Sequence, residues 1–172
     1  MAGQTDDRDH TAIRHAKLAG LRKFWAEARG DRPLPAWRPC QPEEFKPWFG
    51  HLIVLRVESV PQQYFVKLYG TQVVAYTGRD MTGKYMDQEV PESARARTLA
   101  PLDRCVRTAQ PVYSRFMSAL PQATGRPLHR LVLPFGAEAS KVDVLLEAVY
   151  VEGWRYTGEF NVDELYEAGP LP

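Results

Sequence analysis

The chain has 172 residues, with 22 Lys and Arg against 21 Asp and Glu, and 44% of its residues are hydrophobic. This length and balance are typical of one folded domain and exclude wholesale disorder. A net charge of +1 gives no general attraction for nucleic acid or for an anionic membrane. No apolar run approaches the roughly 18–20 residues of a membrane helix, and the polar start MAGQTDDRDH is unlike an export signal. We therefore expect a cytoplasmic protein without nucleic-acid or membrane partners.

The N-terminal part predicts a helix over residues 10–29, which Gly30 is placed to end. Its apolar positions Leu18, Leu21 and Trp25 recur at helical spacing. A small sheet domain cannot fully cover such a stripe, so we expect it to be exposed and to mediate homodimerisation.

Residues 31–42 hold four prolines and predict an ordered connector, and residues 43–49 predict one or two helical turns. Two strand-like runs follow at 51–58 and 63–69. Strict alternation along the second run places Phe65, Lys67 and Tyr69 on one face of the strand. Residues 71–90 predict short helical pieces, since their glycines are too closely spaced for one long helix.

A second long helix is predicted over residues 91–109, with Pro101 expected to kink or split it. Three more strands are expected at 112–119, 127–133 and 141–151. The order predicts an α+β fold in which a five-stranded antiparallel sheet has helices inserted between strands two and three and covering one face, preceded by an N-terminal helix.

This order divides the chain into three parts. Residues 1–40 form an N-terminal leader, helix and proline-rich connector, and residues 41–151 form the main domain. Residues 152–172 hold five acidic residues and form an acidic C-terminal tail, with a short strand or helix near 159–167.

Several short motifs resemble the PAS_5 family of small bacterial PAS proteins in their order and spacing, between about residues 17 and 151. The resemblance implies a PAS-like fold that serves sensing or protein–protein signalling without enzymatic chemistry. The motifs are Phe24-Trp25, Leu34-Pro35, Pro47-Trp48-Phe49-Gly50-His51-Leu52, Tyr69-Gly70-Thr71, Gly78-Arg79-Asp80-Met81-Thr82-Gly83, Pro111-Val112 and Leu131-Val132-Leu133-Pro134.

The same resemblance argues against two cofactors of PAS domains. Flavin-photochemical members place a reactive cysteine where this chain has Met86. Haem-binding members commonly take their axial histidine from the long helix, and residues 91–109 contain none. Flavin held without a cysteine adduct and haem ligated from elsewhere stay open.

Aromatic and aliphatic residues around the predicted sheet allow two interpretations. They fill an ordinary core, or they line a cavity in which tyrosine hydroxyls orient a ligand. The candidate pocket residues are Phe65, Tyr69, Tyr76, Tyr85, Leu102, Val106 and Phe116.

The sequence gives less support for a catalytic, metal or anion site than for the pocket. The glycines at 70, 78 and 83 fit no phosphate-binding spacing, and the four histidines fit no metal spacing. Arginines between residues 95 and 130 are expected to be solvated or paired with the acidic tail, and Cys105 to be a buried, inert thiol. Asp103 and His129 could form an acid–base pair only in a cone-shaped enzyme of the ketosteroid-isomerase type.

We therefore expect a stand-alone sensory or regulatory domain, not an enzyme, that binds a small ligand or a signalling partner protein and forms a homodimer. The alternatives are the cone-shaped α+β enzyme and a structural adaptor with a filled core.

Overall fold

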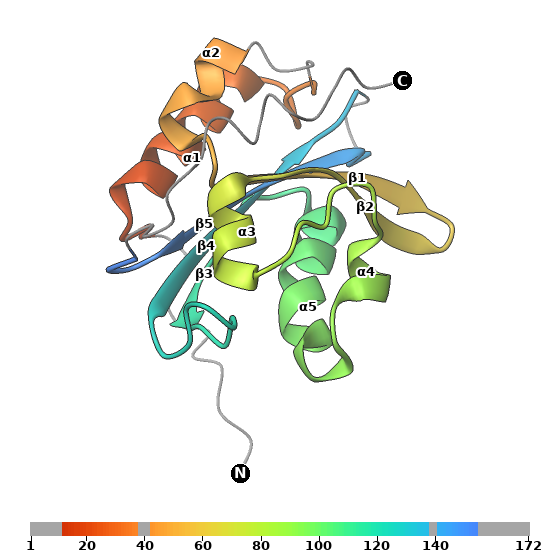
Figure 1. Ribbon diagram of the computed structural model, residues 1–172. Helices are drawn as coiled ribbons and strands as arrows, with labels where there is room; N and C mark the ends of the chain where they lie inside the picture. Colours follow the sequence, from red (N-terminus) through yellow and green to blue (C-terminus); the bar gives the residue numbers. More distant parts are fainter. Residues whose placement is uncertain (1–11, 38–41, 138–140, 155–172) are drawn as a thin grey trace, which may run out of the picture.

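A computed structural model describes residues 12–37, 42–137 and 141–154. The start of the predicted N-terminal leader and the predicted element near 159–167 lie outside the described residues. The elements, shown in Figure 1, are α1 (Ala16–Arg29), α2 (Pro42–Phe45), the 3-10 turn η1 (Lys46–Trp48), β1 (Leu52–Ser59), β2 (Gln62–Tyr69), α3 (Thr71–Thr77), α4 (Met86–Glu89), α5 (Glu92–Thr108), β3 (Val112–Met117), β4 (Pro127–Phe135) and β5 (Val144–Val151).

In the described residues the strands form one antiparallel sheet of five, in the order β2-β1-β5-β4-β3. The last strand, β5, lies in the centre, because Ala148 is opposite both Leu52 of β1 and Leu131 of β4. The α+β class, the antiparallel sheet and the helices between β2 and β3 are thus confirmed. Since most of the helical residues, those of α3, α4 and α5, lie between β2 and β3, the order counts against the cone-shaped enzyme fold, which leads with its helices.

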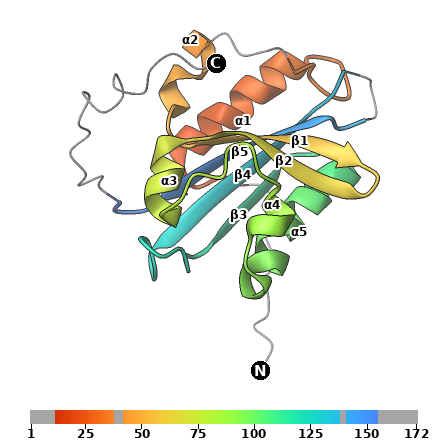
Figure 2. The same ribbon diagram turned by 45° about the vertical axis from the view of Figure 1, so that its right-hand side comes forward.

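Helices cover both faces of the sheet (Figures 1 and 2). α3, α4 and α5 lie over one face, called here the cavity face, which includes Ile53, Arg130 and Glu147. α1 lies over the other, called the α1 face, which includes His129 and Tyr150. The prediction of one helix-covered face is therefore wrong. Nearly continuous burial along β4 and β5 is the pattern of strands covered on both sides.

The α1 stripe is part of the core of the monomer. Leu18 and Leu21 are 0% exposed and Trp25 is 2% exposed, so the prediction of an exposed stripe is wrong. Two indole nitrogens fix the helix: Trp25 Nε1 donates to Pro134 O at 2.7 Å, and Trp48 Nε1 donates to Lys17 O at 2.7 Å. Dimerisation through this stripe loses its premise, and the homodimer stays a prediction.

A β-bulge in β2 decides which side chains face the helices. Val54 is opposite Leu68, but Leu55 is opposite Val66, which leaves Lys67 without a partner on β1. One extra residue reverses the alternation beyond it. Phe65 therefore pairs with Arg56 on the α1 face, and the prediction that it shares a face with Tyr69 is wrong.

Close backbone approach explains one glycine of the motif that follows β2. A Cβ atom on Gly70 would lie 2.3 Å from the carbonyl oxygen of Gly50, so only glycine fits where β2 passes the start of β1. Farther along, α5 continues through Pro101, and the expected split does not occur. Within the described residues, no helix combines the length and the hydrophobicity needed to cross a bilayer.

Candidate functional site

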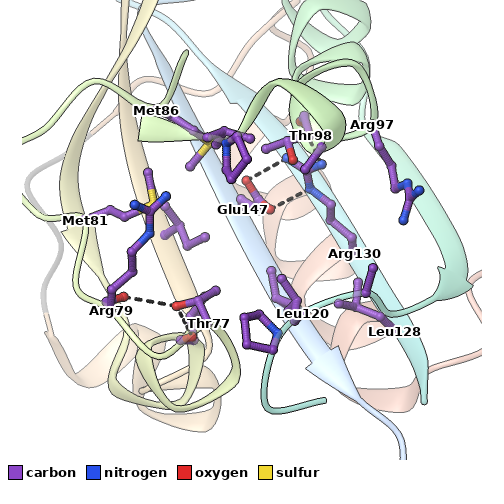
Figure 3. Close-up of a pocket in the computed structure, with 18 of the residues that line it drawn as sticks. Thr77, Arg79, Met81, Met86, Arg97, Thr98, Leu120, Leu128, Arg130 and Glu147 are labelled. Carbon is purple, nitrogen blue, oxygen red and sulfur yellow. Dashed lines mark hydrogen bonds and ion pairs between the residues drawn. The ribbon is translucent and has the colours of Figure 1, made fainter. Parts of the chain in front are cut away.

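A cavity of about 650 Å³ lies between the cavity face of the sheet and the helices α3 to α5, and Figure 3 looks into it. Its volume is within the range of small-molecule sites, roughly 300–1,000 Å³. The strands form the floor, while the helices, the α3–α4 connection and the β3–β4 connection form the walls. Most of the lining is apolar, including Ile53, Val73, Met81, Met86, Val90, Leu120, Leu128 and Val149.

Of the predicted pocket residues, Tyr69 and Phe116 line the cavity from β2 and β3. Tyr69 follows the bulge and lies opposite Ile53 of β1, which also lines the cavity, and its burial raises the pKa of the phenol to about 12. Phe116 stands opposite Leu128 on the neighbouring strand, which also lines the cavity. Both residues are in regular register with a neighbouring strand residue that lines the cavity, Ile53 for Tyr69 and Leu128 for Phe116.

The other predicted pocket residues lie elsewhere, so their assignment to the cavity is wrong. Phe65 precedes the bulge and packs against Tyr85, with 5.2 Å between ring centroids. Tyr76 points toward His51, its hydroxyl 3.1 Å from Nδ1. Leu102 and Val106 lie farther along α5 and pack in the core.

The first turns of α5 line the cavity through positions that share one helix face. These are Ser93, Ala94, Arg97 and Thr98. The cavity does not extend to Leu102, one turn later, where the side chain is fully buried.

A buried ion pair crosses the floor between β4 and β5. Arg130 Nε lies 2.5 Å from Glu147 Oε1, and Arg130 Nη2 donates to Glu147 Oε2 at 3.0 Å. Both side chains are about 95% buried, with 5% and 4% exposed. Arg130 Nη1 also donates to Thr98 O of α5 at 2.9 Å. The expectation that this arginine is solvated or paired with the tail is wrong, because its partner is the one acidic residue of β5.

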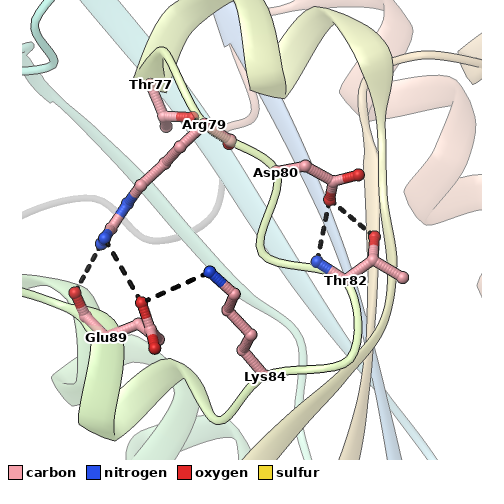
Figure 4. Close-up of polar contacts among 6 residues, drawn as sticks. All are labelled: Thr77, Arg79, Asp80, Thr82, Lys84 and Glu89. Carbon is pink, nitrogen blue, oxygen red and sulfur yellow. Dashed lines mark hydrogen bonds and ion pairs between the residues drawn. The ribbon is translucent and has the colours of Figure 1, made fainter.

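A second arginine of the cavity lining, Arg79, is held by Glu89 (Figure 4). Arg79 Nη2 donates to the backbone oxygen of Glu89 at 2.5 Å, and Nη1 lies 3.5 Å from its carboxylate. Lys84 lies 3.8 Å from the same carboxylate. Asp80 Oδ1 accepts hydrogen bonds from the amide and hydroxyl of Thr82, which shapes the turn between α3 and α4.

The lining residues do not fit cysteine-adduct flavin or histidine-ligated haem. Met86, at the position of the reactive cysteine, is buried in the cavity wall. Among the described residues that line the cavity, none is cysteine or histidine. Cys105 lies outside the cavity lining, its Sγ is 3.7 Å from Val132 O, and burial raises the pKa of its thiol.

Asp103 and His129 do not come together. Asp103 on α5 accepts a hydrogen bond of 2.5 Å from the hydroxyl of Tyr64, whose pKa is raised by burial first and by this hydrogen bond second. His129 lies on the α1 face, with Nδ1 2.7 Å from the hydroxyl of Tyr113. The acid–base pair of the enzyme interpretation is therefore not assembled.

Three histidines meet under the first turn of α1. His15 stands 5.2 Å from His129 and 4.4 Å from Tyr150 between ring centroids, and His51 stacks on Tyr150 at 3.9 Å. His129 Nε2 is 2.5 Å from Glu152 Oε1, and this hydrogen bond lowers the pKa of the carboxyl. Burial lowers the pKa of His15 and of His51, and for His15 the charge of His129 lowers it further.

These shifts predict that the domain loses stability on acidification. The pKa of His15 and of His51 is lower folded than the unfolded value of 6.5, so the unfolded chain binds more protons as pH falls below that value. The contribution is fully present above pH 6.5 and is lost as pH falls through the folded pKa. Urea midpoints measured between about pH 7.5 and pH 5.5 should decrease, and His15→Gln should flatten the decrease. An equal slope in wild type and variant would contradict this assignment.

The sheet order, the inserted helices and the cavity beneath them define a PAS-like α+β domain. The chain belongs to the PAS_5 family, because the profile of that family, described as a PAS domain, matches residues 13–149. The match includes α1 and every strand except the end of β5. The resemblance expected from the sequence is confirmed. No curated protein was found to match the chain.

Solved structures of similar fold include the LOV protein of Rhodobacter sphaeroides, with 14% identity and a TM-score of 0.47, covering 60% of this chain and 59% of that one. A sensory box sensor histidine kinase from Vibrio cholerae has 13% identity and a TM-score of 0.48, with coverage of 78% and 94%. A fungal LOV domain photoreceptor has 15% identity and a TM-score of 0.44, with coverage of 78% and 90%. The chain thus spans about three fifths of the Rhodobacter protein.

Proposed function

We propose that this PAS domain is a sensory or regulatory module that binds a small molecule in the cavity and acts through a signalling partner protein. The observation that carries the proposal is the cavity of about 650 Å³ under α3 to α5. The cavity opens to solvent and most of its lining is apolar, so water inside it is in contact with carbon surface. A small molecule with an apolar body that displaces this water removes that surface from water, which is favourable.

The second candidate function is a structural adaptor, which differs from a ligand-binding sensor in having no need for a cavity. An adaptor would keep a filled core and would not need the space between α5 and the sheet. The lining around Phe116 and Leu128 leaves this space open in the folded chain. We therefore expect the protein to be an adaptor only if the purified chain neither retains nor binds a small molecule.

The test begins with the purified full-length chain. Its absorption spectrum and its mass under native conditions, compared with the mass after denaturation, would reveal a retained ligand. Adding a metabolite pool should raise the melting temperature by mass action if a ligand of the cavity is present.

Filling the cavity should abolish this response. Ala94→Trp places an indole in the space from α5, since Ala94 lines the cavity, whereas Ala96→Trp on the same helix adds it at an exposed position outside the lining. We expect Ala94→Trp to lose the thermal shift and the retained mass, and Ala96→Trp to keep both. If wild type shows neither retained mass nor shift, the adaptor replaces the sensor.

A further inference from the structure

The arginines that line the cavity differ in whether an acidic residue of the protein pairs with them. The lining holds three arginines, Arg79, Arg97 and Arg130, and one acid, Glu147. Glu147 pairs with Arg130 through two contacts of 2.5 and 3.0 Å. Arg79 is held by the carbonyl and carboxylate of Glu89. Two of the three guanidinium groups therefore already have an anionic partner in the protein.

Arg97 is the exception. It is exposed on the first half of α5, and among the described residues no carboxylate lies within ion-pair distance of it. Figure 3 shows the side chain of Arg97 extending from α5, with no interaction drawn to it. The acid at the start of α5, Glu92, pairs with Arg95 at 3.0 Å and not with Arg97. The result is a hydrated cation without a counter-charge beside an apolar space.

We propose that the ligand of the cavity is an organic monoanion with a large apolar body, whose acid group pairs with Arg97. This inference rests on the proposed function and specifies the class of ligand. The apolar body would fill the space over Leu128 and Val149, where burial of carbon is favourable. The planar guanidinium binds a carboxylate or sulfonate through two parallel hydrogen bonds.

The arrangement favours a single negative charge at the mouth of the cavity. A second acid group would have to compete with Glu147 for Arg130 or with Glu89 for Arg79. An acid group deep in the cavity would meet the buried carboxylate of Glu147. A neutral apolar molecule would gain nothing from Arg97.

Two fluorescent probes separate the charge from the apolar body. 8-Anilinonaphthalene-1-sulfonate and N-phenyl-1-naphthylamine share the same rings and differ by the sulfonate. We expect the sulfonate probe to bind wild type, and Arg97→Ala to weaken its affinity by about two- to fivefold, as for an exposed ion pair. The affinity of the neutral probe should stay unchanged in this variant.

Arg107→Ala is the matched control, since it removes an exposed arginine from the same helix outside the cavity lining. It should leave both affinities as in wild type. Arg97→Lys keeps the charge and should recover part of the loss. Ala94→Trp should abolish binding of both probes if they occupy the cavity, and its melting curve without probe shows that it is folded.

The outcomes distinguish this inference from the function on which it rests. If both probes bind, are excluded by Ala94→Trp and are equally unaffected by Arg97→Ala, the cavity binds ligands and the anion assignment is overturned. The assignment is also overturned if Arg97→Ala weakens both probes alike. If neither probe binds, or Ala94→Trp excludes neither, the ligand-binding cavity itself is rejected, and the inference with it.

Discussion

Trp25→Ala is expected to lower the free energy of unfolding by about 3–5 kcal/mol, the range for removing a large aromatic side chain from a core. Trp25 is 2% exposed between α1 and the sheet, and its indole nitrogen satisfies the carbonyl of Pro134. The variant loses the packed ring and leaves that carbonyl without its donor. Urea unfolding followed by circular dichroism measures the change.

Two further variants separate the packing from the hydrogen bond. Trp25→Phe keeps most of the ring and removes the donor, so its loss should be smaller, about 1–3 kcal/mol. Lys23→Ala changes an exposed residue of α1, whose contact with Glu27 is 3.8 Å, and should change stability by less than about 0.5 kcal/mol. If Trp25→Ala behaves like Lys23→Ala, α1 is not part of the folded core.

Glu147→Leu is expected to destabilise the domain by about 3–5 kcal/mol, because it leaves the guanidinium of Arg130 buried without a counter-charge. Arg130 would keep only its hydrogen bond to Thr98 O. The geometry of the pair, with two contacts and about 95% burial of both side chains, makes water a poor substitute. The same unfolding measurement applies.

The double variant Arg130→Met/Glu147→Leu is the decisive comparison. Replacing both members of a buried pair by apolar groups of similar size is often neutral or stabilising, so the double variant should be more stable than Glu147→Leu alone. The two substitutions should therefore be strongly non-additive. Losses that simply add would mean that the two charges are independent in the folded chain.

The sequence was sufficient for those features that depend on local periodicity. The alternation of β1 and β3 and the helical phase of α1 and α5 are repeated over several residues, so each element could be predicted without its neighbours. Lys67 could not be predicted as a bulge, because nothing in the run QYFVKLY marks the extra residue. That one position moved Phe65 out of the predicted pocket.

The burial of both sheet faces and the pairing of Arg130 with Glu147 each left a signal in the sequence. An apolar stripe such as that of Leu18 and Leu21 does not say whether it is covered by the same chain or by a second copy. The nearly continuous apolar runs of β4 and β5, however, are typical of strands buried on both faces. Each of these runs also holds one charge at the cavity face, Arg130 and Glu147, and lone opposite charges in neighbouring buried strands indicate a pair.

The placement of the aromatic residues determines which part of the domain tryptophan fluorescence reports on. The chain has four tryptophans, at positions 25, 37, 48 and 154, and none of them lines the cavity. The aromatic rings at the cavity are those of Tyr69 and Phe116. Tryptophan emission excited selectively near 295 nm therefore reports on the layers around the cavity and not on its contents. A colourless ligand that alters this emission has moved protein atoms outside its own site, so the emission measures the response of the protein, while the retained mass measures occupancy.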